Sequence, residues 1–369
     1  MQLNRLYFID AIRAFAILMM LQGHFIDTLL AIEYRDPNNM AYSIWQYFRG
    51  ITAPVFFTIS GLIFTYLLIK AKAKGKLNYR MRRGVVRGLM LIGIGYALRI
   101  PLLRWLTGSF GTYFLVIDVL QIIGVSLILI VGLYILSQKK TLLFSILMFC
   151  LGTVIFLCEP LYRSYEAKGI PLLFANYLSK SHGSVFNLAP WFGYVAYGGF
   201  IATLFYRYLI RPRFKIVIVS SFFVVGIALV YGASSLLHWL AVQTDFTLLS
   251  EVANYNYLFV RLGNVLILFG LFYALEVYLR HPVVLKIGQK TLSIYVVHFI
   301  LLYGSFTGWG IKRIIGKNLT PMDAILGAFC FLIVVSLISI YIIKPNTQVY
   351  GFFRRQAFEL KTFIKSLNS

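Results

Sequence analysis

Apolar runs long enough to cross a lipid bilayer recur along this chain from one end to the other. Hydrophobic residues make up 60% of its 369 residues and charged residues only 13%. Soluble proteins, in contrast, are about half apolar and about a quarter charged. The sequence therefore predicts an all-α fold, a polytopic membrane helix bundle.

The apolar runs indicate about ten transmembrane helices in a single integral-membrane domain, residues 1–369. The runs lie near residues 6–30, 44–69, 86–106, 112–136, 141–160, 186–206, 214–238, 257–279, 289–309 and 323–343. The first run is too long and too charged for a cleaved signal peptide, so we expect it to be retained as a helix. After the last run we expect a short basic cytoplasmic tail at about 345–369.

The distribution of lysine and arginine predicts the orientation, because cytoplasmic loops are enriched in both. Eight basic residues lie between Lys70 and Arg87, and basic loops recur after every second run. These loops and the two termini hold 23 of the 35 Lys and Arg residues, against eight in the opposite loops. We therefore expect both termini on the cytoplasmic side of the cell (cytoplasmic, or inner) membrane. The net charge of +23 then indicates anionic membrane lipid as a partner and argues against nucleic acid.

The first helix carries four ionisable residues within the apolar stretch "RLYFIDAIRAFAILMMLQGHFID". They are Asp10, Arg13, His24 and Asp27. At about 100° per residue, all four fall within one arc of roughly 100° on the helix surface. Lipid cannot solvate such a stripe, so it must face the inside of the bundle or a watery cavity.

Two pairs with the same spacing make up this stripe. Asp10 and Arg13 are three residues apart near the cytoplasmic end, where they can neutralise one another. His24 and Asp27 repeat this spacing toward the outer end, where a carboxylate would orient an imidazole that acts as a general base. Arg13 and His24 are about 16 Å apart along the helix and could contact different parts of one long ligand. The alternatives are a polar face that only packs against other helices, and a proton relay.

Four further polar residues at membrane depth are candidate substrate-binding residues. Arg49 could bind an anionic intermediate or a substrate carboxylate, or extend to the interface. Asp118 is a candidate ligand of the acceptor or a hydrogen-bonded structural acid. Arg261 lies near the outer end of the eighth run, and His298 lies deep in the ninth, where a structural hydrogen bond is the alternative.

No motif of metal or nucleotide chemistry is present in the sequence. It has no Walker loop, no HExxH and no glycine-rich dinucleotide fingerprint. The three cysteines, Cys150, Cys158 and Cys330, lie in or beside apolar runs with the spacing of neither a disulfide framework nor a metal site. We therefore expect no metal.

The segment "IDAIRAFAILMMLQGHFID" after Arg5 resembles the opening of the transmembrane acyltransferase superfamily. This group includes bacterial acyltransferase-3 proteins and the heparan-alpha-glucosaminide N-acetyltransferase branch. "RGITAPVFFTISGL" resembles its second helix, and "DVLQIIGVSLIL", "NLAPWFGYVAYGGF" and "LSIYVVH" resemble segments of the glucosaminide branch. That branch usually has Gly where Ala14 stands and Arg where Ile122 stands, which leaves the branch open.

The resemblance implies an acyltransferase that moves an acyl group, expected to be acetyl, from cytoplasmic acetyl-CoA or another acyl-CoA. The acceptor would be a hydroxyl or amine of a sugar or glycan on the outer face. His24 matches the catalytic histidine of the family, and Arg13 matches an arginine associated with the donor, with Asp10 beside it. His24 would act as the base or as a transient acyl carrier, oriented by Asp27.

Two other classes of function stay open at this point. A proton-coupled small-molecule transporter could use the same intramembrane charges as a relay, although no repeated halves are visible in the sequence. A ligand-sensing membrane protein would perform no chemistry. The acceptor, the choice of N- or O-acylation, the acyl length and the formation of a homo-oligomer also stay open.

Overall fold

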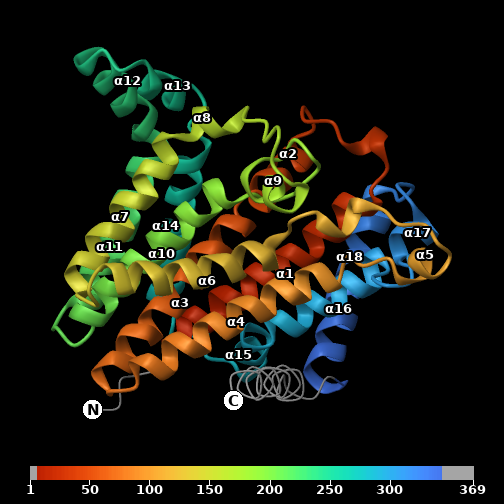
Figure 1. Cartoon of the computed structure of the whole chain (residues 1–369), viewed down its shortest axis with the longest axis horizontal. Helices are drawn as coiled ribbons and strands as arrows, with labels where there is room; N and C mark the ends of the chain where they lie inside the picture. Colours follow the sequence, from red (N-terminus) through yellow and green to blue (C-terminus); the bar gives the residue numbers. More distant parts are fainter. Residues whose placement is uncertain (1–5, 343–369) are drawn as a thin grey trace, which may run out of the picture.

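The computed structural model describes residues 6–342, which form a helix bundle without a β-strand (Figure 1). The α-helices are α1 (Tyr7–Leu29), α2 (Met40–Arg49), α3 (Thr52–Ala73), α4 (Leu77–Ala97), α5 (Leu102–Leu106), α6 (Val119–Leu136), α7 (Thr141–Leu157), α8 (Glu159–Arg163), α9 (Leu172–Leu178), α10 (Leu188–Tyr208), α11 (Phe214–Ile227), α12 (Ala233–Thr244), α13 (Thr247–Asn254), α14 (Tyr257–Ala274), α15 (Pro282–Gln289), α16 (Thr291–Tyr303), α17 (Ile311–Ile315) and α18 (Pro321–Leu337). This confirms the all-α prediction; the predicted basic tail lies outside the described residues.

The predicted count of ten spans is not confirmed. Within residues 6–342, seven helices are long and apolar enough to cross a membrane, or eight if α15 and α16 form one bent span. The two remaining runs are helical but lack the length or the apolar composition of a membrane span. Helix α7 has only 17 residues, and the first half of α4 is strongly basic. The run predicted at 289–309 corresponds to α16, which ends at Tyr303, and the preceding helix α15 meets α16 at an angle of 70°.

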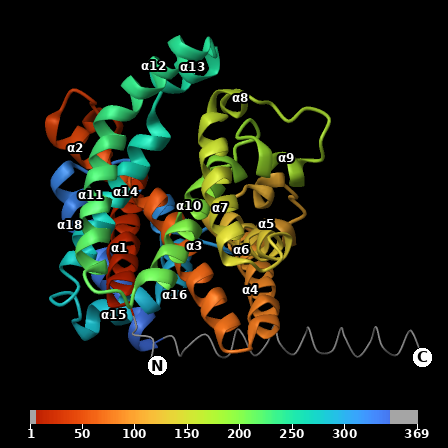
Figure 2. The ribbon, with the colours of Figure 1, turned by 90° about the vertical axis from the view of Figure 1, so that its left-hand side faces the viewer.

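The molecule has two distinct ends. Figure 2 shows α12, α13, α8 and α9 at one end, and the α3–α4 turn and α15 at the other. The last turn of α3 and the α3–α4 turn together carry Lys70, Lys72, Lys74 and Lys76. We call this end the basic end; α1 begins there and runs toward the opposite end.

Glycines set the closest helix crossings. Gly61 of α3 faces the carbonyl of Val195 on α10, and Gly198 of α10 faces the carbonyl of Thr58 on α3. Gly88 of α4 faces Gly124 of α6 in the same reciprocal way. Small residues allow helix backbones to approach this closely in a membrane, so these crossings fix the bundle that encloses the site.

α1 lies between the other helices and contacts α3, α14, α15, α16 and α18. Its first backbone amides, those of Tyr7 and Phe8, donate to the buried carboxylate of Glu276. Near its start it crosses α15, where Gly288 packs against the carbonyl of Asp10. The polar stripe of α1 is therefore enclosed by protein on several sides.

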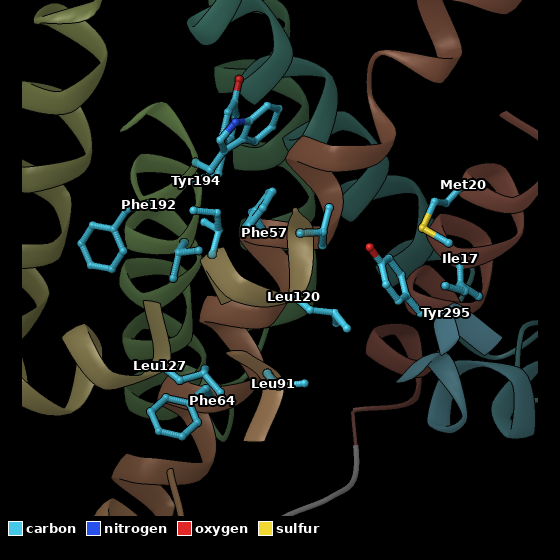
Figure 3. Close-up of a cluster of buried hydrophobic side chains, with 14 of the residues drawn as sticks. Ile17, Met20, Phe57, Phe64, Leu91, Leu120, Leu127, Phe192, Tyr194 and Tyr295 are labelled. Carbon is cyan, nitrogen blue, oxygen red and sulfur yellow. The ribbon is translucent and has the colours of Figure 1, made fainter. Parts of the chain in front are cut away.

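The buried apolar core extends from α1 across α3, α4 and α6 to α10. Figure 3 shows Met20 and Tyr295 on one side of this region, Leu91 and Leu120 beside them, and Phe57 and Tyr194 beyond. Close glycine crossings join α3 to α10 and α4 to α6. These four helices therefore form a closely packed layer opposite α1.

We expect Gly198→Ala to destabilise the protein by about 1–3 kcal/mol, since the new Cβ would clash with the Thr58 carbonyl oxygen. Gly132→Ala on α6 is the control, because a Cβ there meets no atom within 4 Å. That control should be neutral or stabilising by up to about 1 kcal/mol, since alanine favours helix. Thermal unfolding in detergent measures both, and equal midpoints would contradict the close crossing.

Candidate functional site

A cavity of about 680 Å³ lies between α1, α2, α3, α4, α6, α14 and α16. Its wall includes the polar residues Arg13, His24, Ser43, Gln46, Tyr47, Arg49, Thr52, Ser60, Arg87, Trp191, Tyr257, Arg261, Thr291 and Tyr295. The polar stripe of α1 thus faces the interior, as predicted, and Arg13 and His24 open onto the same space. The volume falls within the range of small-molecule and cofactor sites.

Arg13 and Arg87 lie at the end of the cavity nearer the basic end of the bundle. Arg13 donates from Nη2 to Oγ1 of Thr291 at 2.6 Å, and its Nη1 is 3.9 Å from Oδ1 of Asp10. The predicted Asp10–Arg13 pair is therefore confirmed. Arg87 of α4 lines the same region and forms no ion pair among the described residues. These two guanidinium groups make this part of the cavity positively charged.

Arg49 and Arg261 line the opposite end of the cavity. The Arg49 side chain lies across Gly23 of α1, next to His24, and its Nη2 is 2.9 Å from Oδ2 of Asp27. Arg261 of α14 lies against Gly50 and donates from Nη1 to the backbone carbonyl of Tyr47 at 2.8 Å. The absence of a Cβ at both glycines gives the two arginines room to reach the cavity.

Helix α2 closes this end of the cavity through polar anchors. The indole of Trp45 donates to Gln22 of α1 at 2.9 Å, and the hydroxyl of Tyr47 donates to Asn264 of α14 at 3.0 Å. The guanidinium of Arg261 also stacks on the Tyr47 ring. These contacts tie α2 to α1 and α14 and hold it against the cavity.

His24 contacts a second histidine. Its Nδ1 is 3.2 Å from Nε2 of His298 on α16, and His298 is completely buried. Asp27, the expected partner, pairs with Arg49, and its Oδ1 is 3.8 Å from Arg35. The hydrogen-bond partner of His24 is therefore His298 rather than Asp27, because two arginines compete for that carboxylate.

The hydrogen-bond partners of Asp118 belong to the helix bundle and not to the cavity. Its Oδ2 accepts from Arg99 at 2.8 Å, and its Oδ1 accepts from the backbone of Val119 at 2.9 Å. Together with Gln121 it forms a capping box at the start of α6. Asp118 is buried, whereas its neighbours Val119 and Leu120 line the cavity. Of the two roles expected for Asp118, the geometry supports the structural one.

Among the described residues, the cavity wall contains four arginines and one histidine but no aspartate or glutamate. Asp10 and Asp27 contact two of these arginines from outside the wall. A space lined in this way favours anionic ligands, since guanidinium groups bind phosphates and carboxylates through paired hydrogen bonds.

Several of these residues were not predicted from the sequence. Arg87 was counted only as a basic loop residue, although α4 carries it up to the cavity. No sequence pattern marked Thr291 as a site residue, because its contact with Arg13 depends on the break between α15 and α16. Gly23 and Gly50 matter for the space that they leave, which a sequence pattern does not reveal.

The sequence profile of the heparan-alpha-glucosaminide N-acetyltransferase catalytic region matches residues 5–244, about two thirds of the chain. The chain belongs to this family. The protein is thus a multi-pass membrane protein of an acetyltransferase family, and the match is to the glucosaminide branch of the predicted superfamily. No match to an individual curated protein was found. The matched part includes Arg13, His24 and Arg49, whereas Arg261 and α16 lie beyond it.

We expect Asp118→Asn to destabilise the protein by about 3 kcal/mol or more, because it leaves the buried Arg99 guanidinium without a counter-charge. Asparagine is also a good helix cap, so the change mainly removes the charge. Asp245→Asn, at an exposed turn, is the control. Chemical or thermal unfolding measures the effect. A normal unfolding midpoint with a raised acceptor KM would instead support the substrate-binding role.

Proposed function

We propose that this protein transfers an acetyl group from acetyl-CoA to a hydroxyl or amine of a sugar, with His24 at the reacting centre. One observation carries the proposal: His24 opens onto a single cavity with Arg13 and Arg87 toward one end and Arg49 and Arg261 toward the other. In this arrangement a donor and an acceptor could meet at one imidazole while entering from opposite sides.

The basic end of the bundle is the proposed entry for the donor, and we propose that it faces the cytoplasm. CoA carries several phosphates, and the lysines of the α3–α4 turn would raise its local concentration. Arg13 and Arg87 would then bind an anionic part of the donor, with Arg13 held in place by Thr291 and Asp10. Since Arg13 and His24 are about 16 Å apart along α1, only an extended donor could reach both.

The proposed reaction needs one proton acceptor at the centre of the cavity. The acceptor hydroxyl or amine gives its proton to His24 as its oxygen or nitrogen attacks the thioester carbonyl carbon. The new carbon–oxygen or carbon–nitrogen bond forms, the carbon–sulfur bond breaks, and the CoA thiolate takes the proton back from His24. In the alternative route the acetyl group first moves to His24 and then to the acceptor.

The opposite end of the cavity is the proposed acceptor site. Tyr47, Arg49 and Arg261 line it, and the acceptor would enter beneath α2. The family name points to an amino sugar, so an amine on a sugar is the first acceptor to test. Arg261 contacts no carboxylate among the described residues and is free to bind an acidic group of such an acceptor.

His24→Ala should lower kcat by about 10²–10⁴-fold, the usual contribution of a general base. The test uses purified protein in detergent or liposomes with labelled acetyl-CoA, and scores thiol release and acetyl transfer to glucosamine and to glycans. His238→Ala on the exposed part of α12 is the matched control. Full activity in a folded His24→Ala protein would overturn the mechanism. Counterflow of an unmodified solute would indicate the transporter instead.

Arg13→Gln should raise the KM for acetyl-CoA by about 10- to 100-fold, since a hydrogen bond to a charged group contributes about 1.5–3 kcal/mol. The KM for the acceptor should change little, because Arg13 and His24 are separated along α1. Arg82→Gln, on the exposed part of α4, controls for the general loss of positive charge. Equal effects on donor and acceptor KM would contradict the assignment of Arg13 to the donor.

A further inference from the structure

His298 lies outside the region matched by the family and yet contacts the central residue of the cavity. It is completely buried on α16, does not line the cavity, and meets His24 through one ring nitrogen at 3.2 Å. A residue in this position cannot touch a ligand in the cavity. Its contact with His24 is the direct route by which it can act on the reacting centre.

We infer that His298 is a positioning residue that holds the His24 proton on Nδ1 and leaves Nε2 of His24 open to the cavity. The inference rests on the proposed role of His24. It also replaces the substrate-binding role that the sequence suggested for His298.

The assignment of the protons follows from the contact itself. Two imidazole nitrogens at 3.2 Å share one hydrogen, so one ring donates and the other accepts. If His298 donated, the unprotonated nitrogen of His24 would be Nδ1, which is already engaged and points away from the reactants. If His24 donates, its lone pair lies on Nε2, where a base acting on a ligand in the cavity is required.

The surroundings of His298 favour its role as the acceptor. Its Nε2 faces His24, and the backbone carbonyls of Ile294 and Tyr295, one turn earlier on α16, lie near the ring. Its buried Nδ1 makes no hydrogen bond of normal geometry among the described residues, so these carbonyls act on it as nearby dipoles. A carbonyl attracts a protonated nitrogen, so the proton of His298 belongs on the backbone-side Nδ1 and its lone pair on Nε2. The rings of Tyr295 and Phe299 pack against His298 at centroid distances of 5.0 and 5.9 Å and keep it in this orientation.

Helix α16 connects this contact to the other end of the cavity. Its first residue, Thr291, accepts from Arg13, and His298, two turns later, meets His24. The two contacts follow the same order along α1 and α16, so these helices run side by side in one direction. The break after α15 starts α16 at the level of Arg13. A single short helix therefore orients both the proposed donor residue and the proposed base.

The contact also matters once the base has taken a proton. Protonation of Nε2 makes His24 an imidazolium, and its Nδ1–H bond to His298 then becomes a charge-assisted hydrogen bond. The nearby charged groups that act on His24 are Asp118, Arg49 and Asp27. Of the groups around it, His298 is the one that contacts the Nδ1 nitrogen directly.

The test compares His298→Leu, His298→Gln and Val297→Ala in the full-length protein. His298→Leu removes the acceptor and should lower kcat on the order of 10- to 100-fold, the cost of losing a partner that orients a functional imidazole. The KM for acetyl-CoA should stay unchanged. His298→Gln places an amide oxygen near the position of Nε2 and should restore most of kcat. Val297→Ala removes buried apolar atoms from the same helix, at a residue with no proposed role, and should keep kcat.

A double substitution separates this inference from the proposed function. If His298 acts through His24, then His298→Leu combined with His24→Ala should be no slower than His24→Ala alone. Normal kcat in His298→Leu with an inactive His24→Ala protein would overturn the positioning role and leave the proposed function intact. Full activity in His24→Ala would overturn both. A loss in His298→Leu that His298→Gln does not restore, with lowered stability, would indicate a packing role only.

Discussion

Three ionisable side chains of the polar stripe of α1 have partners on other parts of the chain, and the arrangement of the bundle depends on these pairs. Arg13 contacts Thr291, His24 contacts His298, and Asp27 contacts Arg49. A charged or polar group without a partner at membrane depth is costly, so the pairs constrain which helices can lie beside α1. They place α16 and the α2–α3 junction around it, and the cavity is the space that remains between these elements.

The charge of the cavity follows from where the carboxylates are. Asp10 and Asp27 lie behind Arg13 and Arg49 and leave the guanidinium groups exposed to the cavity, while Asp118 neutralises Arg99 away from it. The wall is therefore positive at both ends, and His24 lies between the two ends. This distribution suits two ligands that both carry negative charge, one entering from each side, better than a single small solute that passes through.

Part of this site could be predicted from the sequence. The helix period places the ionisable residues on one face of α1, and the free-energy cost of charged groups in lipid turns that face inward. The inward stripe of α1, the Asp10–Arg13 pair and the all-α fold all followed from spacing and hydropathy. The partner of His24 did not, since Asp27 is near in sequence whereas His298 is 274 residues away. The bend between α15 and α16 was also missed, because no proline lies at Lys290, where the two helices meet.

The region beyond residue 244 contributes residues that the candidate site needs. The family match covers the proposed base, the proposed donor-binding arginine and the helices α3, α4 and α6. Residues beyond the match supply Arg261 at one end, Thr291 at the other, and the imidazole that contacts His24. Since α1 is enclosed only when α14, α15 and α16 pack against it, the matched part alone would expose its polar stripe to lipid. The C-terminal helices are therefore as much a part of the proposed catalytic unit as the first helix.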